Sequence, residues 1–181
     1  MSALDGQGGA ARTVGLKLPL LVWIAAEFVL LASILVLSSR LPESVAVHFD
    51  AAGRANGWMS RSAHIGVFSA LSLGLPGFVV GLCAAIRFAP AALFNVPNAS
   101  YWRAPANYPT AGRLLLHRAL WLGVGMCVWS GAFHALIIAA NLETPPRLSQ
   151  NGMAWFNGVS LGCLALWILW LYRTYSRSPK A

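Results

Sequence analysis

The sequence is poor in charge and in cysteine. Only 10% of its 181 residues are charged, compared with about 25% in an average soluble domain, whereas 57% are hydrophobic. This composition excludes an ordinary soluble protein and predicts an integral membrane chain. The three cysteines, Cys83, Cys127 and Cys163, form no C-x-x-C pair. A cysteine-based zinc or redox motif is therefore excluded, and we expect these side chains to pack in apolar surroundings.

Several motifs that identify enzyme classes are also missing. The chain has no P-loop, no dinucleotide-binding glycine fingerprint and no H-E-x-x-H zinc motif, and no serine lies in a recognisable activated setting. These absences favour a non-enzymatic protein.

Long apolar runs dominate what is present. Four of them have about the 20 residues needed to cross the hydrocarbon core of a bilayer, and in lipid such runs must form helices to satisfy their backbone. We predict an all-α, polytopic membrane protein with a four-helix transmembrane domain at residues 18–172, a disordered cytoplasmic tail at 1–17 and a basic cytoplasmic tail at 173–181. The expected spans are residues 18–39, 63–88, 114–140 and 153–172.

The basic residues indicate how these helices are oriented. The formal net charge is +8, but the Lys and Arg residues are scattered at helix ends, so we expect no nucleic-acid partner. Eight lie on one predicted side of the membrane and four, Arg40, Arg54, Arg61 and Arg147, on the other. The positive-inside rule then places both termini in the cytoplasm of a bacterial cell and the protein in its inner membrane.

One polar segment, residues 41–61, stands between the first two runs and combines chemically active side chains with turn residues. Val45 to Phe49 alternates as a short extended piece does, and Asp50, Gly53 and the Asn56–Gly57 pair favour tight turns. We predict a structured outer loop that carries the binding site.

Two interpretations of the polar residues stay open. His48, Asp50, His134 and Glu27 are suitable ligands for a divalent metal, which would make the protein a membrane-embedded metal enzyme. In the alternative, Asp50 caps its own turn and pairs with Arg54 or Arg61, while His48 packs at the mouth of the bundle.

Glu27 also raises a third possibility. A carboxyl near the middle of a span is costly there, so it is either a ligand, proton carrier or gate, or a protonated side chain hydrogen-bonded to a neighbouring helix. A proton-carrying Glu27 would be consistent with a transporter subunit, and a four-helix unit of this kind could act as a homo-oligomer.

The outer segment also carries a resemblance to a known family. Leu41–Pro42 through His48–Phe49, then Gly53, Asn56–Gly57–Trp58 and Ser60–Arg61, resemble the signature of a bacterial membrane protein family of unknown function that is related to SdpI-type immunity proteins. The resemblance continues in residues 95–98 with Tyr101–Trp102, and in residues 134–141 followed by Pro145–Pro146. The resemblance implies a longer arrangement of six spans for the immunity proteins, whereas four spans are predicted for this chain.

This resemblance implies a polytopic inner-membrane protein without an established reaction. It marks Pro42, His48, Phe49, Gly53, Asn56, Gly57 and Trp58, to which our reading of the residues adds Asp50, Glu27 and His134 as binding positions. The expected function is a binding, sensing or immunity-type module that acts through residues 41–61. Its expected partners are membrane lipids and a secreted peptide, toxin or regulatory membrane protein, with no required cofactor.

Overall fold

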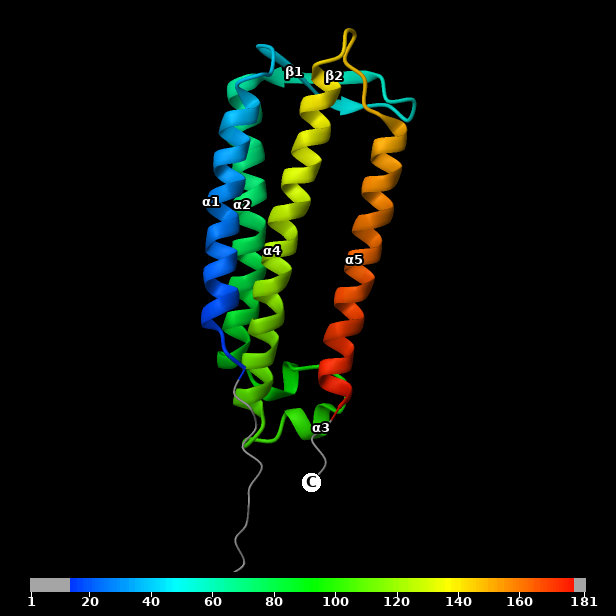
Figure 1. Cartoon of the computed structure of the whole chain (residues 1–181). Helices are drawn as coiled ribbons and strands as arrows, with labels where there is room; N and C mark the ends of the chain where they lie inside the picture. The colour runs from blue at the N-terminus through cyan, green and yellow to red at the C-terminus, as the bar shows by residue number, and fades with distance from the viewer. Residues whose placement is uncertain (1–13, 178–181) are drawn as a thin grey trace, which may run out of the picture.

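The computed structural model describes residues 14–177. Within this range, four long helices run along one axis: α1 (Lys17–Ser38), α2 (Arg61–Ala85), α4 (Tyr108–Asn141) and α5 (Gln150–Ser176) (Figure 1). Each is long and apolar enough to cross a membrane. The predicted architecture is confirmed, and it indicates a multi-pass membrane protein.

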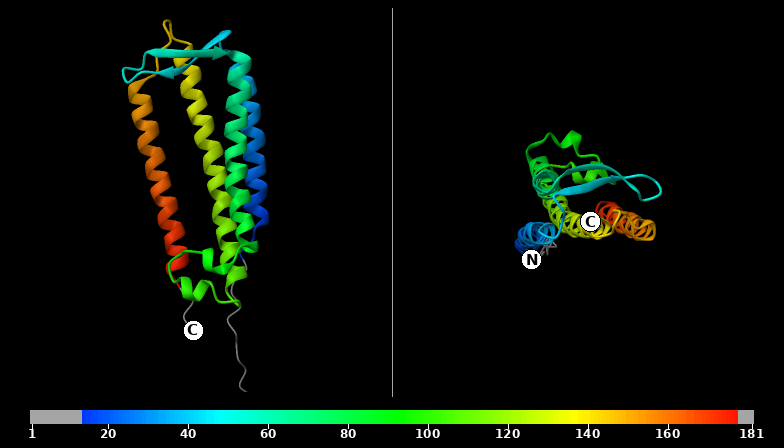
Figure 2. Two further views of the ribbon diagram at one scale, coloured as in Figure 1. Left: turned by 180° about the vertical axis from the view of Figure 1, so that it is seen from behind. Right: turned by 90° about the horizontal axis from the view of Figure 1, so that it is seen from above.

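Helix α4 is the centre of the bundle. It packs against α1, α2 and α5, whereas α5 packs mainly against α4 among the long helices. Seen from above, α1, α4 and α5 form a row, with α2 beside it (Figure 2). The buried core between α1, α2 and α4 includes Leu30, Ile34, Val80, Ala119, Leu120 and Cys127. Tyr175 is the one fully buried residue of α5, and the side of this helix that packs on α4, including Phe156, is half-buried.

The helix ends follow local chemistry. Helix α1 stops shortly before Pro42 because proline disfavours helical geometry in the residue ahead of it. Ser60 and Ser149 cap α2 and α5, accepting hydrogen bonds from the amides of Ala63 and Gly152. Pro109 opens α4, where its missing N–H costs nothing, and the helix therefore begins before the predicted start at residue 114.

The C-terminal prediction needs correction. Residues 173–176, expected in a basic tail, form the last turn of α5, and Tyr175 is only 1% exposed. Most of the predicted N-terminal tail, residues 1–13, and the last four residues lie outside the described range.

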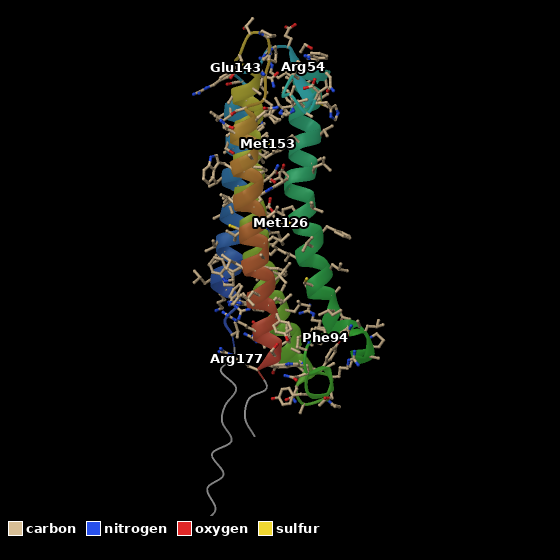
Figure 3. The ribbon with its side chains drawn as sticks, turned by 90° about the vertical axis from the view of Figure 1, so that its right-hand side faces the viewer. Arg54, Phe94, Met126, Glu143, Met153 and Arg177 are labelled. Atoms are coloured by element: carbon tan, nitrogen blue, oxygen red, sulfur yellow. The ribbon has the colours of Figure 1, made fainter. Side chains whose placement is uncertain are left out.

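An aromatic cluster closes the end of the bundle where α2 and α5 end and α4 begins. The connector from α2 to α4 forms three short helices, η1 (Ile86–Phe88), η2 (Ala91–Leu93) and α3 (Ala99–Trp102). Its residues Phe94 and Trp102 pack on Tyr175. The Trp102 indole donates to the Tyr175 carbonyl, and the Tyr175 hydroxyl donates to Ala111 in α4. Phe94 and Arg177 lie at this end in Figure 3, and Arg54 and Glu143 lie at the other.

The predicted outer loop is an antiparallel hairpin of strands β1 (Ser44–Phe49) and β2 (Ala55–Ser60). It lies across the end of the bundle, from α2 toward α5 (Figure 2). Val45 and Ala46 are fully buried, and Val45 packs with Leu41 and Ile138. The hairpin is thus part of the core.

A single side chain of α4 fastens the buried strand. The amide of Asn141 accepts a 2.7 Å hydrogen bond from Ala46 N–H and donates a 2.9 Å bond to Ala46 C=O. Its nitrogen also donates to Ile137 C=O. Asn141 is 6% exposed, so water cannot replace it. Its amide pairs with β1 as a neighbouring strand would.

The tip of the hairpin is held by the loop before α5. Leu148 N–H donates to Gly53 C=O at 2.8 Å, and the Gln150 amide donates to Ala51 C=O at 2.6 Å. Gly53 has a φ of 77°, a region that side chains disfavour. A Cβ there would also clash with the carbonyl oxygen of Leu148. Only glycine allows this contact.

Replacing Asn141 by Leu should release the hairpin from the bundle. The substitution leaves the N–H and C=O of Ala46 buried without partners, at a cost of about 1–3 kcal/mol. We expect a lower unfolding midpoint in detergent micelles, together with faster hydrogen exchange at the Ala46 amide.

Asn157→Leu is the matched control because Asn157 lies on the exposed surface of α5. It should leave hairpin exchange unchanged. Equal exchange rates in the two variants would contradict the role assigned to Asn141.

Candidate functional site

An irregularity in β1 sets the direction of His48. Val45 pairs with Met59 and Ala46 with Trp58, but the register then skips Val47 and pairs His48 with Gly57. Such a bulge re-aims the side chains that follow it. His48 therefore shares a face with Met59, and it is exposed while lining the rim of a pocket beneath the hairpin. In an unbroken strand it would lie on the opposite face from Val45.

Gly57 makes room for that histidine. A Cβ at position 57 would lie 2.9 Å from Cδ2 of His48, which is too close for a real contact. The motif positions His48 and Gly57 thus depend on each other sterically.

A pocket of about 250 Å³ lies beneath the hairpin, between α2 and α4. We call it the hairpin-capped pocket. It is lined by Val47, His48, Met59, His64, Val67, Phe68, Leu71, Phe133 and Ile137. Its walls are mostly apolar, and the two histidines are their strongest polar groups. A second, open hollow lies nearby in the polar loop between α4 and α5 and is lined by residues 143 and 147–151.

Two buried histidines contact each other at the hairpin-capped pocket, where His64 lines the wall and His134 lies behind it. The rings of His64 in α2 and His134 in α4 stack with centroids 5.5 Å apart, and both contact Phe68. His134 is 0% exposed and shares a 3.2 Å hydrogen bond between its Nε2 and the Ser38 hydroxyl. His64 is 4% exposed, and its Nε2 has no hydrogen-bond partner among the described residues.

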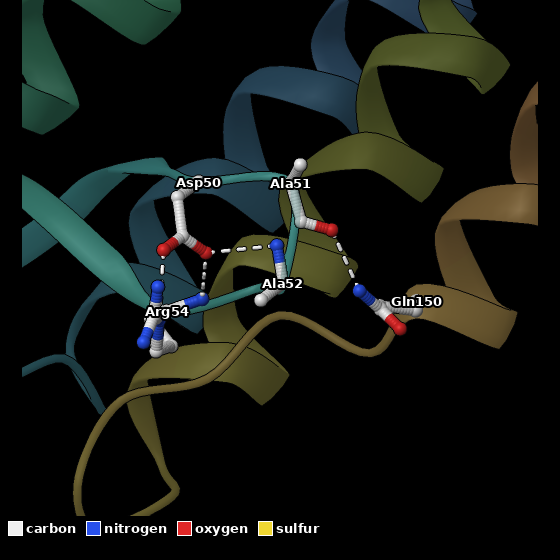
Figure 4. A network of polar contacts seen from close by, with 5 residues as sticks. All are labelled: Asp50, Ala51, Ala52, Arg54 and Gln150. Carbon is white, nitrogen blue, oxygen red and sulfur yellow. Dashed lines mark hydrogen bonds and ion pairs between the residues drawn. The ribbon is translucent and has the colours of Figure 1, made fainter.

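Asp50 stabilises the hairpin turn. One carboxylate oxygen accepts from the amides of Ala52 and Arg54, and the other accepts from the Arg54 guanidinium at 2.8 Å (Figure 4). Hydrogen bonds from the Arg54 backbone and then its side chain lower the pKa of Asp50 below its ordinary value. The structure agrees with the turn-capping alternative, in which Asp50 pairs with Arg54.

Glu27 lies far from the histidines. Its Oε1 accepts a 2.9 Å hydrogen bond from the Trp23 indole in the same helix, and it lies beside Cys127 of α4. Ser38, which contacts His134, is eleven residues further along α1, or about 16 Å at 1.5 Å per residue.

The predicted metal-ligating set is therefore not assembled in this arrangement. Glu27 is separated from His134, and both oxygens of Asp50 are engaged in the hairpin turn. Within residues 14–177, no three His, Cys, Asp or Glu side chains are placed to hold a metal ion.

The other marked positions surround the hairpin. Trp58 is 55% exposed, and Pro42 and Asn56 are exposed as well, whereas Phe49 is half-buried. An exposed Trp on the hairpin suits the headgroup region of a membrane. These residues do not line the hairpin-capped pocket.

Sequence reasoning missed His64, which the structure places at the pocket. A signal was available, since His64, Phe68 and Leu71 have the spacing of one helical face, and a histidine inside an apolar span is unusual. Nothing in the spacing of the sequence could have paired it with His134, because that contact joins two different helices.

The sequence does contain one motif that is typical of catalytic serines. Residues Gly158 to Gly162 match G-x-S-x-G, whose nucleophilic serine requires a sharp strand-to-helix turn. Here the five residues lie inside α5, and the Ser160 hydroxyl donates to the Phe156 carbonyl one turn earlier. The match carries no nucleophile.

Comparison with known families identifies the segment that contains the hairpin. Residues 28–73 match the family described as Domain of unknown function (DUF1648). The DUF1648 segment comprises the second half of α1, the hairpin and the first half of α2. It supplies His48 and His64, whereas His134 and Asn141 come from outside it.

A search of curated proteins and of solved structures found no match to the chain. The relation of the DUF1648 segment to SdpI-type immunity proteins stays a prediction.

Gly57→Ala should displace His48 from the pocket mouth. The new methyl group would overlap the His48 ring, so we expect the imidazole to move away from the hairpin-capped pocket and its NMR signals to shift. Gly74→Ala is the control, because a Cβ at that helical position meets no atom within 4 Å. Unchanged His48 signals in Gly57→Ala would contradict the steric dependence of the two residues.

Proposed function

We propose that this protein is a membrane-embedded binding module that holds an apolar ligand, carrying one hydrogen-bonding group, in the hairpin-capped pocket. The observation that carries this proposal is His64, whose buried Nε2 lacks a partner in an otherwise apolar wall. Burying such a group without a hydrogen bond costs about 1–3 kcal/mol. A ligand that supplies the bond recovers this free energy.

The surroundings support a preformed site. The bulge and Gly57 hold His48 at the mouth, while Ser38, His134 and Phe68 hold His64 from behind. Pockets that bind small ligands are mostly apolar with a few well-placed polar groups, and the hairpin-capped pocket has this composition. Polar side chains inside membrane helices also commonly mark functional sites.

The charge distribution supports an outward-facing pocket. The hairpin end carries Arg40, Arg54, Arg61 and Arg147. Among the described residues, the opposite end carries Lys17, Arg87, Arg103, Arg113, Arg173 and Arg177. By the positive-inside rule, the hairpin lies outside the bacterial inner membrane and both termini lie in the cytoplasm. A sensing or immunity-type role, with a secreted peptide, toxin or membrane partner as its object, is consistent with this orientation.

Ligand binding is tested with 1-octanol, a probe that has an apolar chain and one hydroxyl. In protein with ¹⁵N-labelled histidine rings, octanol should shift the His64 signals, because the hydroxyl occupies the free Nε2. His117, near Trp170 at the other end of the bundle, should not respond.

Two matched substitutions locate the response. Leu71 and Leu75 are both exposed on α2, but only Leu71 lines the pocket. Leu71→Trp should reduce the octanol-induced shift of His64 at least threefold, and Leu75→Trp should leave it intact. Equal shifts at His64 and His117, or equal effects of both tryptophans, would refute the binding site.

Orientation is tested by labelling intact cells with a membrane-impermeant maleimide. Ser44→Cys in the exposed start of β1 should react, whereas Arg177→Cys at the far end should react only after the membrane is opened, both in a Cys163→Ser background. The reverse pattern would place the pocket in the cytoplasm.

A further inference from the structure

We infer that the ligand of the hairpin-capped pocket is a phospholipid from the surrounding leaflet, which enters sideways along the exposed flank of α2. This inference rests on the proposed binding function and specifies the ligand class.

The pocket opens along the flank of α2. Val67 and Leu71 line it, yet they are 50% and 66% exposed, so this wall is uncovered on its outer side. On the water-facing side, the hairpin lies across the end of the bundle (Figure 1). The uncovered flank belongs to a helix apolar enough to span a membrane. A molecule dissolved in the bilayer can therefore reach the pocket directly through this flank.

The same flank continues as an apolar track away from the pocket. Its members, spaced along one face of the helix, are all at least half exposed and are Val67, Leu71, Leu75, Phe78 and Leu82. The track is about 22 Å long at 1.5 Å per residue, which exceeds half of a hydrocarbon core of about 30 Å. It is long enough to support a full acyl chain.

The polarity of the site matches that of a lipid in place. His48 and His64 lie at the hairpin end, near the predicted membrane surface, and the track below them is apolar. An acyl chain on this track would bring its ester carbonyl toward His64, where it would bond the free Nε2.

The volume also favours a partly enclosed chain. The pocket measures about 250 Å³, less than the roughly 300–1,000 Å³ of sites that enclose a whole small ligand. It therefore takes one segment of a longer molecule. A peptide arriving from water fits this pocket less well. Its backbone groups would need several hydrogen-bond partners, whereas the otherwise apolar walls offer only two histidines.

The test uses vesicles of phosphatidylethanolamine and phosphatidylglycerol that contain a phospholipid with a photoreactive diazirine in its acyl chain. After illumination, labelled peptides are mapped by mass spectrometry. Labelling around Leu71 should exceed labelling around the exposed Val159 and Leu166 of α5 at least fivefold. It should fall at least fivefold in Leu71→Trp and persist in Leu35→Trp, because Leu35 is exposed on α1 and belongs neither to the pocket nor to the track.

Two variants of His64 test the polar contact. His64→Phe keeps a ring against Phe68 and His134 but removes the hydrogen-bonding nitrogen, so we expect at least threefold less labelling around Leu71. His64→Gln keeps a donor and an acceptor and should restore it. Equal loss in both variants would overturn the assigned contact.

Even labelling of α2 and α5 in every variant would mean ordinary boundary lipid and would overturn the inference. If octanol still shifts His64 in that case, the binding function stands and its ligand arrives from water, as a peptide would. If neither probe responds at the pocket, the binding function fails as well.

Discussion

The pairing of the Asn141 side chain with the backbone of Ala46 is the contact on which the hairpin end of this structure depends. A buried strand edge must have its N–H and C=O groups satisfied, and here an amide from α4 supplies both bonds. Asn141 lies on the same helical face as His134 and Ile137, and Ile137 lines the pocket. The helix that positions the histidine therefore also positions the strand above it.

Several features follow once β1 is held in this way. Val45 fills the core beside Ile138, and the bulge at Val47 then places His48 on the face of Met59, at the rim of the pocket. Gly57 gives the ring its space. At the tip, Asp50 shapes the turn and Gly53 allows the close approach of Leu148. The glycines and polar residues of the hairpin thus fix its backbone conformation, and the hairpin in this conformation forms one wall of the pocket.

The position of α5 gives the bundle its open side. The helix is attached at one end through Leu148 and Gln150 to the hairpin, and at the other through Tyr175 to the connector before α4. Between these attachments it contacts α4 through aromatic pairs such as Phe133 with Phe156. Because α5 packs mainly on α4, the flank of α2 next to the pocket, with Val67 and Leu71, stays exposed.

The sequence by itself determined the helical membrane class, the four spans and an ordered segment at residues 41–61, because long apolar runs, prolines and turn residues act through local physics. One of the two interpretations of Asp50, the turn cap, also agrees with the structure, because its partners are close in the chain. Only the tertiary structure decided that β1 is bound by Asn141, that His64 stacks on His134 and that Glu27 stands apart from both. These relations join residues up to 95 positions apart, and they depend on how far each helix extends and which face it turns to its neighbour, which local patterns do not encode.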